Sequence, residues 1–294
     1  MSRPRVHVTG AVPARVAAAL AERFQLVDQP QGADGVLALL TTTVDAAYVD
    51  AAGPQLRVVA NYAVGVDNVD LEAAREHRIV VANTPDVLTH ATAELALTLM
   101  LTLLRRVAEG DRLLRRRGSW TFALEFMLGE SLAERSVAIV GPGRIGLATA
   151  QLVECLGART ALCGRGDDLA AALADADVVS LHCPLTPETY HLVDAAFLAR
   201  MRPRAVLINT ARGAVVDERA LVDALRNGVI AGAALDVYEE EPDVAPELLE
   251  LENVVLSPHL GSATRSTREA MGMLAVDALV AVLVDGRRPA NAVV

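Results

Sequence analysis

Short runs of apolar, mostly β-branched residues alternate along the chain with longer segments rich in alanine and leucine. In the first third, we expect a helix over residues 13–23 and strands over residues 5–9, 35–40, 57–60 and 79–82. Strands that alternate with helices in this way are typical of doubly wound parallel sheets. The pattern therefore predicts one small α/β unit at the start of the chain.

A turn at Thr84-Pro85-Asp86 separates this unit from a long apolar segment. The segment predicts one helix over residues 89–116, with a hinge of the chain near Pro85. Its most apolar part, residues 91–104, contains Glu94 and is shorter than the roughly 20 residues that cross a bilayer. We therefore interpret it as a buried helix and expect no membrane partner.

A second α/β unit begins at residue 136 with an uninterrupted apolar run, followed by Gly141-Pro-Gly-Arg-Ile-Gly146 and a helical pattern. Gly141 suits a tight turn, Gly143 allows backbone amides to approach a pyrophosphate, and Gly146 allows the helix to pack closely on the strand. A glycine turn placed between a strand and a helix is a strong signal for dinucleotide binding. The sequence therefore predicts a dinucleotide site here.

The residues at the end of the next predicted strand favour NADP over NAD. An NAD site usually places a carboxylate about 20 residues after the glycine turn, where it binds the ribose hydroxyls and repels a 2′-phosphate. Gly164 stands there in this chain, and Arg165 beside it can pair with that phosphate. The alternative is that Arg165 is only exposed and that Asp167 or Asp168 reaches the ribose.

Composition limits the class of protein. The chain of 294 residues is 52% hydrophobic and 22% charged, which suits two domains with buried cores, and its net charge of -10 argues against a nucleic-acid partner. All 27 basic residues are arginine, which excludes Schiff-base chemistry and a Walker-type nucleotide site. The three cysteines lack zinc-site spacing, so we expect no metal. The N-terminus has no apolar signal core, which predicts a cytoplasmic protein.

Three polar residues late in the chain suggest the chemistry. Arg212, Glu241 and His259 follow the glycine turn in that order. A fixed cation, a carboxylate and an imidazole can bind a 2-oxo acid, polarise its carbonyl and protonate it while a nicotinamide supplies hydride. The alternatives are an arginine in a helix-end ion pair, a packed loop histidine and an exposed acid, with Glu239 and Glu240 as rivals to Glu241.

Four motifs, at residues 177–189, 207–218, 234–242 and 257–264, closely resemble those of the D-isomer-specific 2-hydroxyacid dehydrogenases. The resemblance covers essentially the whole chain, and it includes Asn61-Tyr-Ala-Val-Gly near the start and Pro289-Ala-Asn at the end. It implies an α/β fold of two doubly wound parallel-sheet domains, Rossmann- or flavodoxin-like, with a cleft between them.

The resemblance also implies how the chain is divided. Residues 1–86 plus 265–294 would form the substrate-binding, catalytic domain, and residues 87–264 would form the dinucleotide-binding Rossmann domain. A final helix over residues 265–285 would return the chain to the first domain. Relatives dimerise through the long helix after the hinge, so a homodimer is implied.

Catalytic roles follow from the same resemblance. Arg212 would hold the substrate carboxylate and carbonyl oxygen with a forked geometry that lysine cannot copy. His259 would be the general acid and base, which imidazole suits because its ordinary pKa is about 6.5. Glu241 would orient the ring and raise the pKa of His259. The backbone of Val64 and Gly65 would bind the substrate carboxylate.

The other site residues implied by the resemblance would bind the cofactor. Asp236 corresponds to a contact with the nicotinamide carboxamide. His191, by contrast, has no partner pattern, and we interpret it as structural. The full cofactor set is Thr92, Gly141, Gly143, Arg144, Ile145, Gly146, Gly164, Arg165, His182, Cys183, Pro184, Thr210, Asp236 and Gly261.

The expected reaction is reversible hydride transfer between NAD(P)H and a small 2-oxo acid, giving a D-2-hydroxy acid. The cofactor turn, Asn61-Tyr-Ala-Val-Gly and Phe126-Met-Leu-Gly look most like the glyoxylate and hydroxypyruvate reductases. D-3-phosphoglycerate dehydrogenase and other D-2-hydroxyacid dehydrogenases are the enzymatic alternatives. An NAD(H)-sensing protein that resembles a corepressor is the non-enzymatic alternative, but no low-complexity tail supports it.

Overall fold

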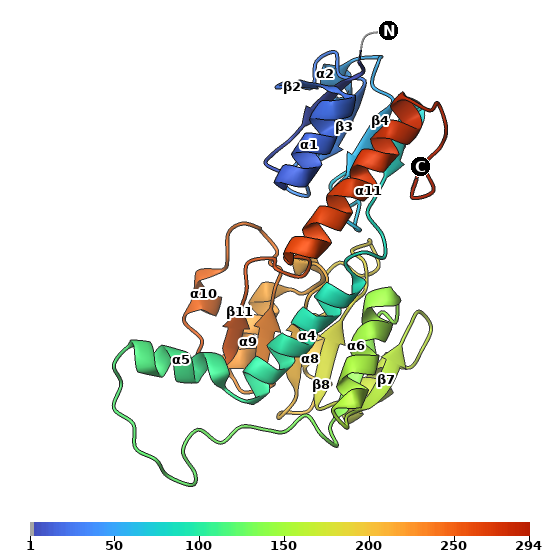
Figure 1. Ribbon diagram of the computed structural model, residues 1–294. Coiled ribbons are helices and arrows are strands. Elements are labelled where there is room, and N and C mark those ends of the chain that lie inside the picture. Colours follow the sequence, from blue (N-terminus) through green and yellow to red (C-terminus); the bar gives the residue numbers. More distant parts are fainter. Residues whose placement is uncertain (1–2) are drawn as a thin grey trace. The chain divides into compact units, whose positions relative to one another are not determined.

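The computed structural model describes residues 3–294, which form two compact units. Unit 1 comprises Met1–Leu88 and Ala263–Val294, and unit 2 comprises Thr89–Ser262. Each unit is built around one sheet whose strands are all parallel (Figure 1). The predicted fold class of two parallel-sheet α/β domains is confirmed.

The sheet of unit 1 has five strands in the order β2-β1-β3-β4-β5. The strands are β1 (Arg5–Val8), β2 (Gln25–Val27), β3 (Gly35–Ala38), β4 (Val58–Asn61) and β5 (Val80–Ala82), and the helices are α1 (Ala14–Arg23), α2 (Ala46–Ala52), α3 (Leu71–Glu76) and α11 (Arg265–Leu283). The sequence pattern did not predict β2, because this edge strand is three residues long and mostly exposed.

The alternating side chains of the strands in unit 1 face two layers of helices. Val36 and Val59 belong to a core cluster with residues of α2 and α3. The neighbouring position, Gly35, faces the other way, where an added Cβ would lie within about 3 Å of Leu279 and Leu283 of α11. Helices α1 and α11 lie side by side on that face (Figure 1). This period of two is what a sheet covered on both faces requires.

The chain beyond α11 pairs with the edge of this sheet. Ala292 forms an antiparallel bridge with Ala82, and the amide of Val293 donates to the carbonyl oxygen of Val81 at 2.7 Å. The amide of Val81 in turn donates to Val294 at 3.1 Å. The C-terminal segment therefore covers β5, which is otherwise an open edge.

The sheet of unit 2 has six strands in the order β11-β10-β9-β8-β6-β7. These are β6 (Ser136–Val140), β7 (Arg159–Cys163), β8 (Val178–Leu181), β9 (Val206–Asn209), β10 (Gly232–Leu235) and β11 (Val254–Leu256). The helices are α4 (Thr89–Leu104), α5 (Val107–Arg115), α6 (Arg144–Cys155), α7 (Leu169–Asp175), α8 (Ala195–Leu198), the 3-10 turn η1 (Gly213–Val215), α9 (Glu218–Arg226) and α10 (Pro246–Leu249).

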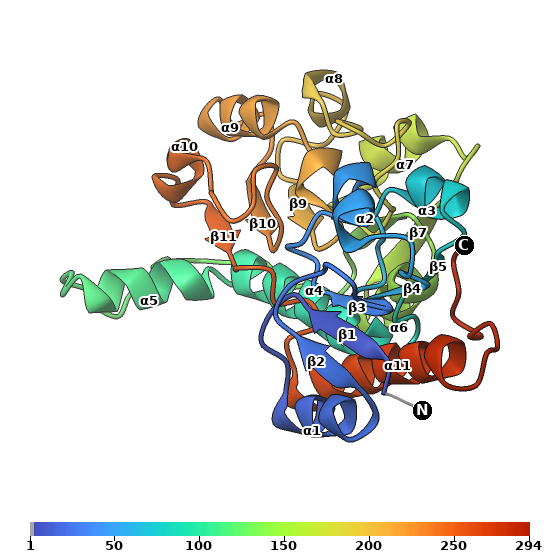
Figure 2. The ribbon, with the colours of Figure 1, turned by 90° about the horizontal axis from the view of Figure 1, so that it is seen from above.

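Helices cover both faces of the second sheet. Met100 of α4 and Val153 of α6 share one core cluster with Ile139 of β6, whereas Leu173 of α7 and Leu221 of α9 share another with the opposite strand faces. Figure 2 shows α8 and α9 on the other side of the sheet from α4 and α6. No helix in the described part of the chain is long and apolar enough to cross a membrane.

The prediction of one helix over residues 89–116 was wrong. Helix α4 ends at Leu104, Arg106 has a left-handed backbone with φ of 53°, and α5 starts at Val107. The cause lies far along the chain, because the amide of Glu130 donates to the carbonyl oxygen of Leu104 at 2.8 Å and Gly129 packs against that carbonyl. The segment around residue 130 thus provides a hydrogen-bond donor for the last carbonyl of α4. Helix α5 extends away from the body of its unit (Figure 1).

Candidate active site

The residues predicted to carry the chemistry of unit 2 follow the carboxyl ends of its strands. Gly141 follows β6, His182 follows β8, Arg212 follows β9, Asp236 follows β10 and His259 follows β11. Because all six strands are parallel, these ends lie at one edge of the sheet, where open α/β sheets bind their ligands.

The turn after β6 requires glycine for two different reasons. Gly141 has φ of 90°, and a Cβ there would lie 2.5 Å from the amide nitrogen of Cys183. A Cβ on Gly146 would lie 2.5 Å from the carbonyl oxygen of Gly141, so a side chain would push α6 off the strand. Gly143 instead faces open space, because within residues 3–294 no atom beyond its neighbours in the chain lies within 4 Å of an added Cβ.

The start of α6 is a suitable anion site. Gly143 is its N-cap, and no side chain of the described residues caps it. The first amides of a helix have no partner within the helix and carry partial positive charge. Exposed Arg144 lies at the first helical position. An approaching pyrophosphate would meet the first amides of the helix and no side chain at Gly143, whose own amide donates to the carbonyl oxygen of Gly141 at 2.8 Å.

Both acids near the end of β7 are engaged locally. Asp167 accepts a hydrogen bond from the amide of Gly164 at 2.7 Å. Asp168 caps α7 through the amide of Ala171 at 3.0 Å. Arg165 between them and the strand is exposed. Within residues 3–294 no hydrogen bond ties Arg165 to its own loop, and Glu188 is an acid with which its charge interacts.

Two buried polar atoms near these strand ends lack a partner in residues 3–294: Nδ1 of His182 and Oγ1 of Thr210. The other nitrogen of His182, Nε2, lies 2.9 Å from Oγ of Ser180. Burial lowers the pKa of His182 to about 4, so the ring is neutral at physiological pH. His182 can therefore accept or donate one hydrogen bond to a ligand, but it cannot offer a phosphate a positive charge.

The backbone around Arg212 is held by Asn209, which is 1% exposed at the end of β9. Nδ2 of Asn209 donates to the carbonyl oxygen of Arg212 at 2.9 Å, and its Oδ1 accepts from the amide of Ala211 at 3.0 Å. Gly213 then packs directly on the chain after β10, where an added Cβ would lie 1.8 Å from the carbonyl carbon of Tyr238. The segments that carry Arg212 and Glu241 are thus in backbone contact.

Glu241 and His259 form a hydrogen-bonded pair. Nδ1 of His259 lies 2.7 Å from Oε2 of Glu241, and Oε1 of the same carboxylate accepts from the amide of Tyr238 at 3.0 Å. Because a carboxylate only accepts, Nδ1 must carry the proton. Nε2 is then the atom of this ring that can exchange a proton with a ligand, and within residues 3–294 it has no partner.

The charge state of Glu241 follows from its partners. Burial raises the pKa of this carboxyl, but the hydrogen bond and charge of His259, the Tyr238 amide and the charge of Arg212 together hold it below its ordinary value. Glu241 is therefore ionised at neutral pH. An ionised acceptor on Nδ1 fixes the tautomer and the orientation of the His259 ring.

Asp236 organises the loop that carries His259. This carboxylate is 1% exposed and accepts from Oγ of Ser257 at 2.6 Å and from the amides of Leu260 and Gly261 at 2.7 and 2.8 Å. His259 has φ of 52°, and its amide donates to the carbonyl oxygen of Asp236 at 2.8 Å. Burial raises the pKa of Asp236. The four bonds hold a non-glycine residue in a conformation it rarely adopts.

Thr92 of α4 lies beside this loop. It is 5% exposed, and a Cβ built on Gly261 would lie 3.4 Å from Cγ2 of Thr92 and 3.4 Å from Oδ2 of Asp236. The structure therefore brings Thr92, Asp236 and Gly261 together, although Thr92 and Asp236 lie 144 positions apart in the sequence.

A second pair of histidine and glutamate uses Glu239, two residues before Glu241, and the sequence pattern gave no sign of it. Nε2 of His191 lies 2.5 Å from Oε1 of Glu239, and His191 stacks on Tyr190. The amide of Glu239 donates to Oε1 of Glu218 at 2.8 Å. Glu239, a rival of Glu241 in sequence, is thus engaged elsewhere, and His191 fixes the loop that leads to Glu241.

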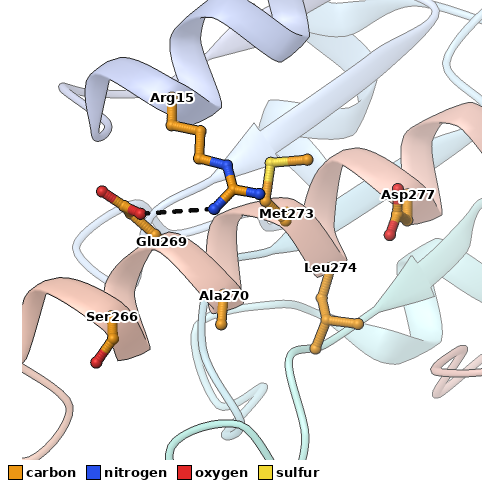
Figure 3. Close-up of a pocket in the computed structure, with 7 residues that line it drawn as sticks. All are labelled: Arg15, Ser266, Glu269, Ala270, Met273, Leu274 and Asp277. Carbon is orange, nitrogen blue, oxygen red and sulfur yellow. Dashed lines mark ion pairs between the residues drawn. The ribbon is translucent and has the colours of Figure 1, made fainter.

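Val64 and Gly65 lie in unit 1, in the loop after β4. A surface groove of the same unit lies between α1 and α11, where Arg15 is 3.8 Å from Glu269 (Figure 3). The groove is lined by helix faces and contains none of the residues predicted to bind substrate or cofactor. We therefore place the candidate site at the strand ends and not in this groove.

Comparison with known families and proteins agrees with this geometry. Residues 97–261 match the model of the D-isomer specific 2-hydroxyacid dehydrogenase NAD binding domain. A glyoxylate reductase of Korarchaeum cryptofilum is 42% identical over 310 residues, covering 95% of this chain and 92% of its own. A glyoxylate reductase of Thermococcus litoralis is 43% identical and covers 92% of this chain and 86% of its own.

Solved structures resemble the chain over nearly its full length. A Thermus thermophilus protein has a TM-score of 0.92 and 43% identity, covering 99% of this chain and 100% of its own. The NADPH-dependent glyoxylate/hydroxypyruvate reductase of Sinorhizobium meliloti, crystallised with NADP and malonate, has a TM-score of 0.88 and 37% identity. The match covers 99% of this chain and 97% of the reductase chain. The chain belongs to the D-isomer-specific 2-hydroxyacid dehydrogenase family, whose members are NAD(P)-dependent oxidoreductases acting on CH-OH groups.

Proposed function

We propose that this enzyme is an NADPH-dependent reductase of glyoxylate and hydroxypyruvate. The observation that carries the proposal is the pair of Glu241 and His259, held at 2.7 Å on strand ends that also carry Arg212 and the Gly141 turn. A bound nicotinamide would supply the hydride. The residues of the chain would bind the 2-oxo acid, orient it and supply the proton.

His259 is the proton donor in this proposal. Its Nε2 faces no protein acceptor in the described residues, and Glu241 on Nδ1 fixes the orientation of the ring. As hydride reaches the carbonyl carbon, the proton on Nε2 moves to the carbonyl oxygen and gives the hydroxyl group. In the reverse direction, Nε2 accepts the hydroxyl proton.

Arg212 is the substrate anchor. Its guanidinium can donate two parallel hydrogen bonds to oxygens of the α-carboxylate and the carbonyl, which polarises the carbonyl and fixes its face. The backbone amides near Val64 and Gly65 in unit 1 would bind the same carboxylate. Unit 1 would thus be the substrate-binding domain, and unit 2 would be the dinucleotide-binding domain.

The chain also fits a dinucleotide. The first amides of α6 and the open space at Gly143 suit a pyrophosphate, and Ile145 and Gly146 continue that turn into the helix. The loop of His182, Cys183 and Pro184 and the unpartnered Oγ1 of Thr210 would contact the rest of the cofactor. Thr92, Asp236 and Gly261 would lie near the nicotinamide.

NADP is favoured over NAD because of the end of β7. The acids that could bind the ribose hydroxyls, Asp167 and Asp168, already accept hydrogen bonds from their own loop. Arg165 is exposed, and in this proposal it would pair with a 2′-phosphate. The similar enzyme of Sinorhizobium meliloti is NADPH-dependent.

Replacing Arg165 by alanine should lower the preference for NADPH over NADH by about 10- to 100-fold, because a charge-assisted contact to the 2′-phosphate is lost. Steady-state kcat/KM for both cofactors at saturating glyoxylate measures the ratio. Arg159→Ala, at the other end of β7, is the matched control and should leave the ratio unchanged. An unchanged ratio in Arg165→Ala would refute the assignment.

The substrate is tested with a panel of 2-oxo acids. Glyoxylate, hydroxypyruvate, pyruvate, longer 2-oxo acids and 3-phosphohydroxypyruvate are each assayed with NADPH and NADH. We expect the highest kcat/KM with glyoxylate or hydroxypyruvate and NADPH. A clear preference for the phosphorylated substrate would replace the proposed function, and no oxidation of either cofactor would end the enzymatic interpretation.

A homodimer is also proposed, and unit 2 supplies the surface. Large apolar side chains are exposed on α5 and the segment after it, including Phe122 at 81% and Leu124 at 86%. Others there are Val107, Leu114, Trp120 and Leu128. Exposed apolar side chains so close together in sequence are typical of a surface that another protein covers. A second copy is the proposed partner, because α5 and this segment extend away from their own unit (Figure 1).

The double substitution Phe122→Ser and Leu124→Ser should convert the dimer to monomers, because it removes apolar area from the surface that would be buried. Sedimentation velocity measures the mass. Leu249→Ser, on α10 with 64% exposure, is the control and should stay dimeric. A wild-type monomer, or a double variant that remains dimeric, would disprove this surface as the interface.

A further inference from the structure

The loop after β4 in unit 1 has an unusual hydrogen-bond pattern. Three consecutive carbonyl oxygens each accept a hydrogen bond: that of Ala63 from the amide of Thr84 at 2.9 Å, that of Val64 from Nδ2 of Asn83 at 2.8 Å, and that of Gly65 from Nδ2 of Asn61 at 2.8 Å. All three donors belong to the ends of β4 and β5 or directly follow them. The carbonyls of the loop therefore point back toward the strand ends.

The amides of the loop must point the other way. In a trans peptide the N–H group lies opposite the preceding carbonyl, so the amides of Val64, Gly65 and Val66 face away from β4 and β5. None of these three amides donates to a protein acceptor within residues 3–294. Free amides on successive residues form a concave site for an anion, and a carboxylate has the right oxygens to accept from them.

Asn61 is rigidly held. It is fully buried, and its amide group exchanges two hydrogen bonds with the side chain of Asn68, at 3.1 and 3.0 Å. Asn68 also donates to the carbonyl oxygen of Thr42 at 3.0 Å. A buried amide with all these partners has little freedom to rotate, so it fixes the Gly65 carbonyl.

Asn83 is held by the C-terminal segment. Its amide donates to the carbonyl oxygen of Asn291 at 3.2 Å, and Nδ2 of Asn291 donates to the carbonyl oxygen of Asn83 at 2.5 Å. The neighbouring bridge between Ala292 and Ala82 keeps this segment in register with β5. The end of the chain is thereby connected to the Val64 carbonyl through one asparagine.

We propose that Asn83 and Asn61 are positioning residues for the substrate carboxylate. By holding the carbonyls of Val64 and Gly65, they aim the amides of Gly65 and Val66 at the carboxylate of the 2-oxo acid, and Asn291 keeps Asn83 in place. Neither asparagine touches the substrate. The inference rests on the proposed function, since it names the residues that prepare one of its binding groups.

Asn83→Ala tests the inference directly. Without its Nδ2 donor the Val64 peptide can rotate, so KM for glyoxylate should rise about tenfold or more while kcat changes little. The dissociation constant of oxamate, a carboxylate analogue of the substrate, should rise by a similar factor in the presence of NADPH. The affinity for NADPH itself should not change.

Asn227→Ala is the matched control, because Asn227 also donates Nδ2 to a carbonyl oxygen at 2.8 Å, that of Asp223, but in unit 2 at the end of α9. It should leave both KM and oxamate binding unchanged. Asn291→Ala should change them in the same direction as Asn83→Ala but by less. Asn83→Ser, which keeps a small polar group too short to reach Val64, replaces the alanine variant if that variant fails to fold.

Three results would overturn the inference. In an active wild-type enzyme, KM and oxamate affinity that stay within twofold in Asn83→Ala exclude a positioning role. A parallel loss of kcat, NADPH affinity and melting temperature indicates a merely structural role. A wild-type protein that neither reduces a 2-oxo acid nor binds oxamate overturns the proposed function as well, so the two failures are distinguishable.

Discussion

His259→Asn should lower kcat for glyoxylate reduction by about 10²- to 10⁴-fold and change KM little. Asparagine can still donate to Glu241, but it has no acidic proton at the position of Nε2. The hydride would then reach a carbonyl whose oxygen has no proton donor, so the loss falls on the chemical step. Steady-state rates at saturating NADPH and glyoxylate measure it.

His77→Asn is the control for that substitution. His77 lies in unit 1, half-exposed, 3.8 Å from Asp50, and it should behave as wild type. Cofactor binding separates catalysis from misfolding, because His259→Asn should still bind NADPH with its ordinary affinity. A His259→Asn enzyme with a kcat within a few-fold of wild type would remove this residue from the mechanism.

Arg212→Lys should lower kcat/KM by about 10²- to 10³-fold although it keeps the positive charge. Lysine offers a single point of charge and cannot span two oxygens with parallel hydrogen bonds. We expect KM to rise and kcat to fall together, because the same contact binds the carboxylate and polarises the carbonyl. Oxamate binding should weaken in step with KM.

The matched substitution for Arg212 is Arg226→Lys, at an exposed arginine of α9 that lies 3.6 Å from Glu250. Replacing arginine by lysine at this exposed ion pair should leave the kinetics and the stability almost unchanged. If Arg212→Lys instead weakened NADPH binding and left substrate kinetics intact, Arg212 would belong to the cofactor site and the proposed anchor would be wrong.

Much of the fold could be predicted because its signals are local. Buried parallel strands appear as short apolar runs, and the strand at residues 136–140 was visible beside its glycine turn. The break between α4 and α5 could not be predicted, because the pattern of residues 89–116 has no stop signal and the chain that ends α4 arrives from Gly129 and Glu130. Contacts between residues that are distant in the sequence leave no periodic pattern from which they could be predicted.

The candidate site divides in the same way. Arg212, Glu241 and His259 could be named because each lies in a motif next to a strand end. The pair of His191 and Glu239 could not, because its members are 48 residues apart and no spacing rule joins them. Asn83 was likewise invisible, since its role depends on the path of the loop at Val64 and not on its own neighbours.

The backbone contact at Gly213 has a consequence for engineering. No side chain fits between Gly213 and Tyr238, so the turn of Arg212 and the loop of Glu241 touch through backbone atoms alone. No side chain at this contact can be repacked to absorb a change in either segment. Chimeras that exchange residues 209–213 with a relative should therefore carry residues 236–241 from the same parent. Directed evolution of substrate range should begin elsewhere, in loops whose contacts are made by side chains and can be repacked singly.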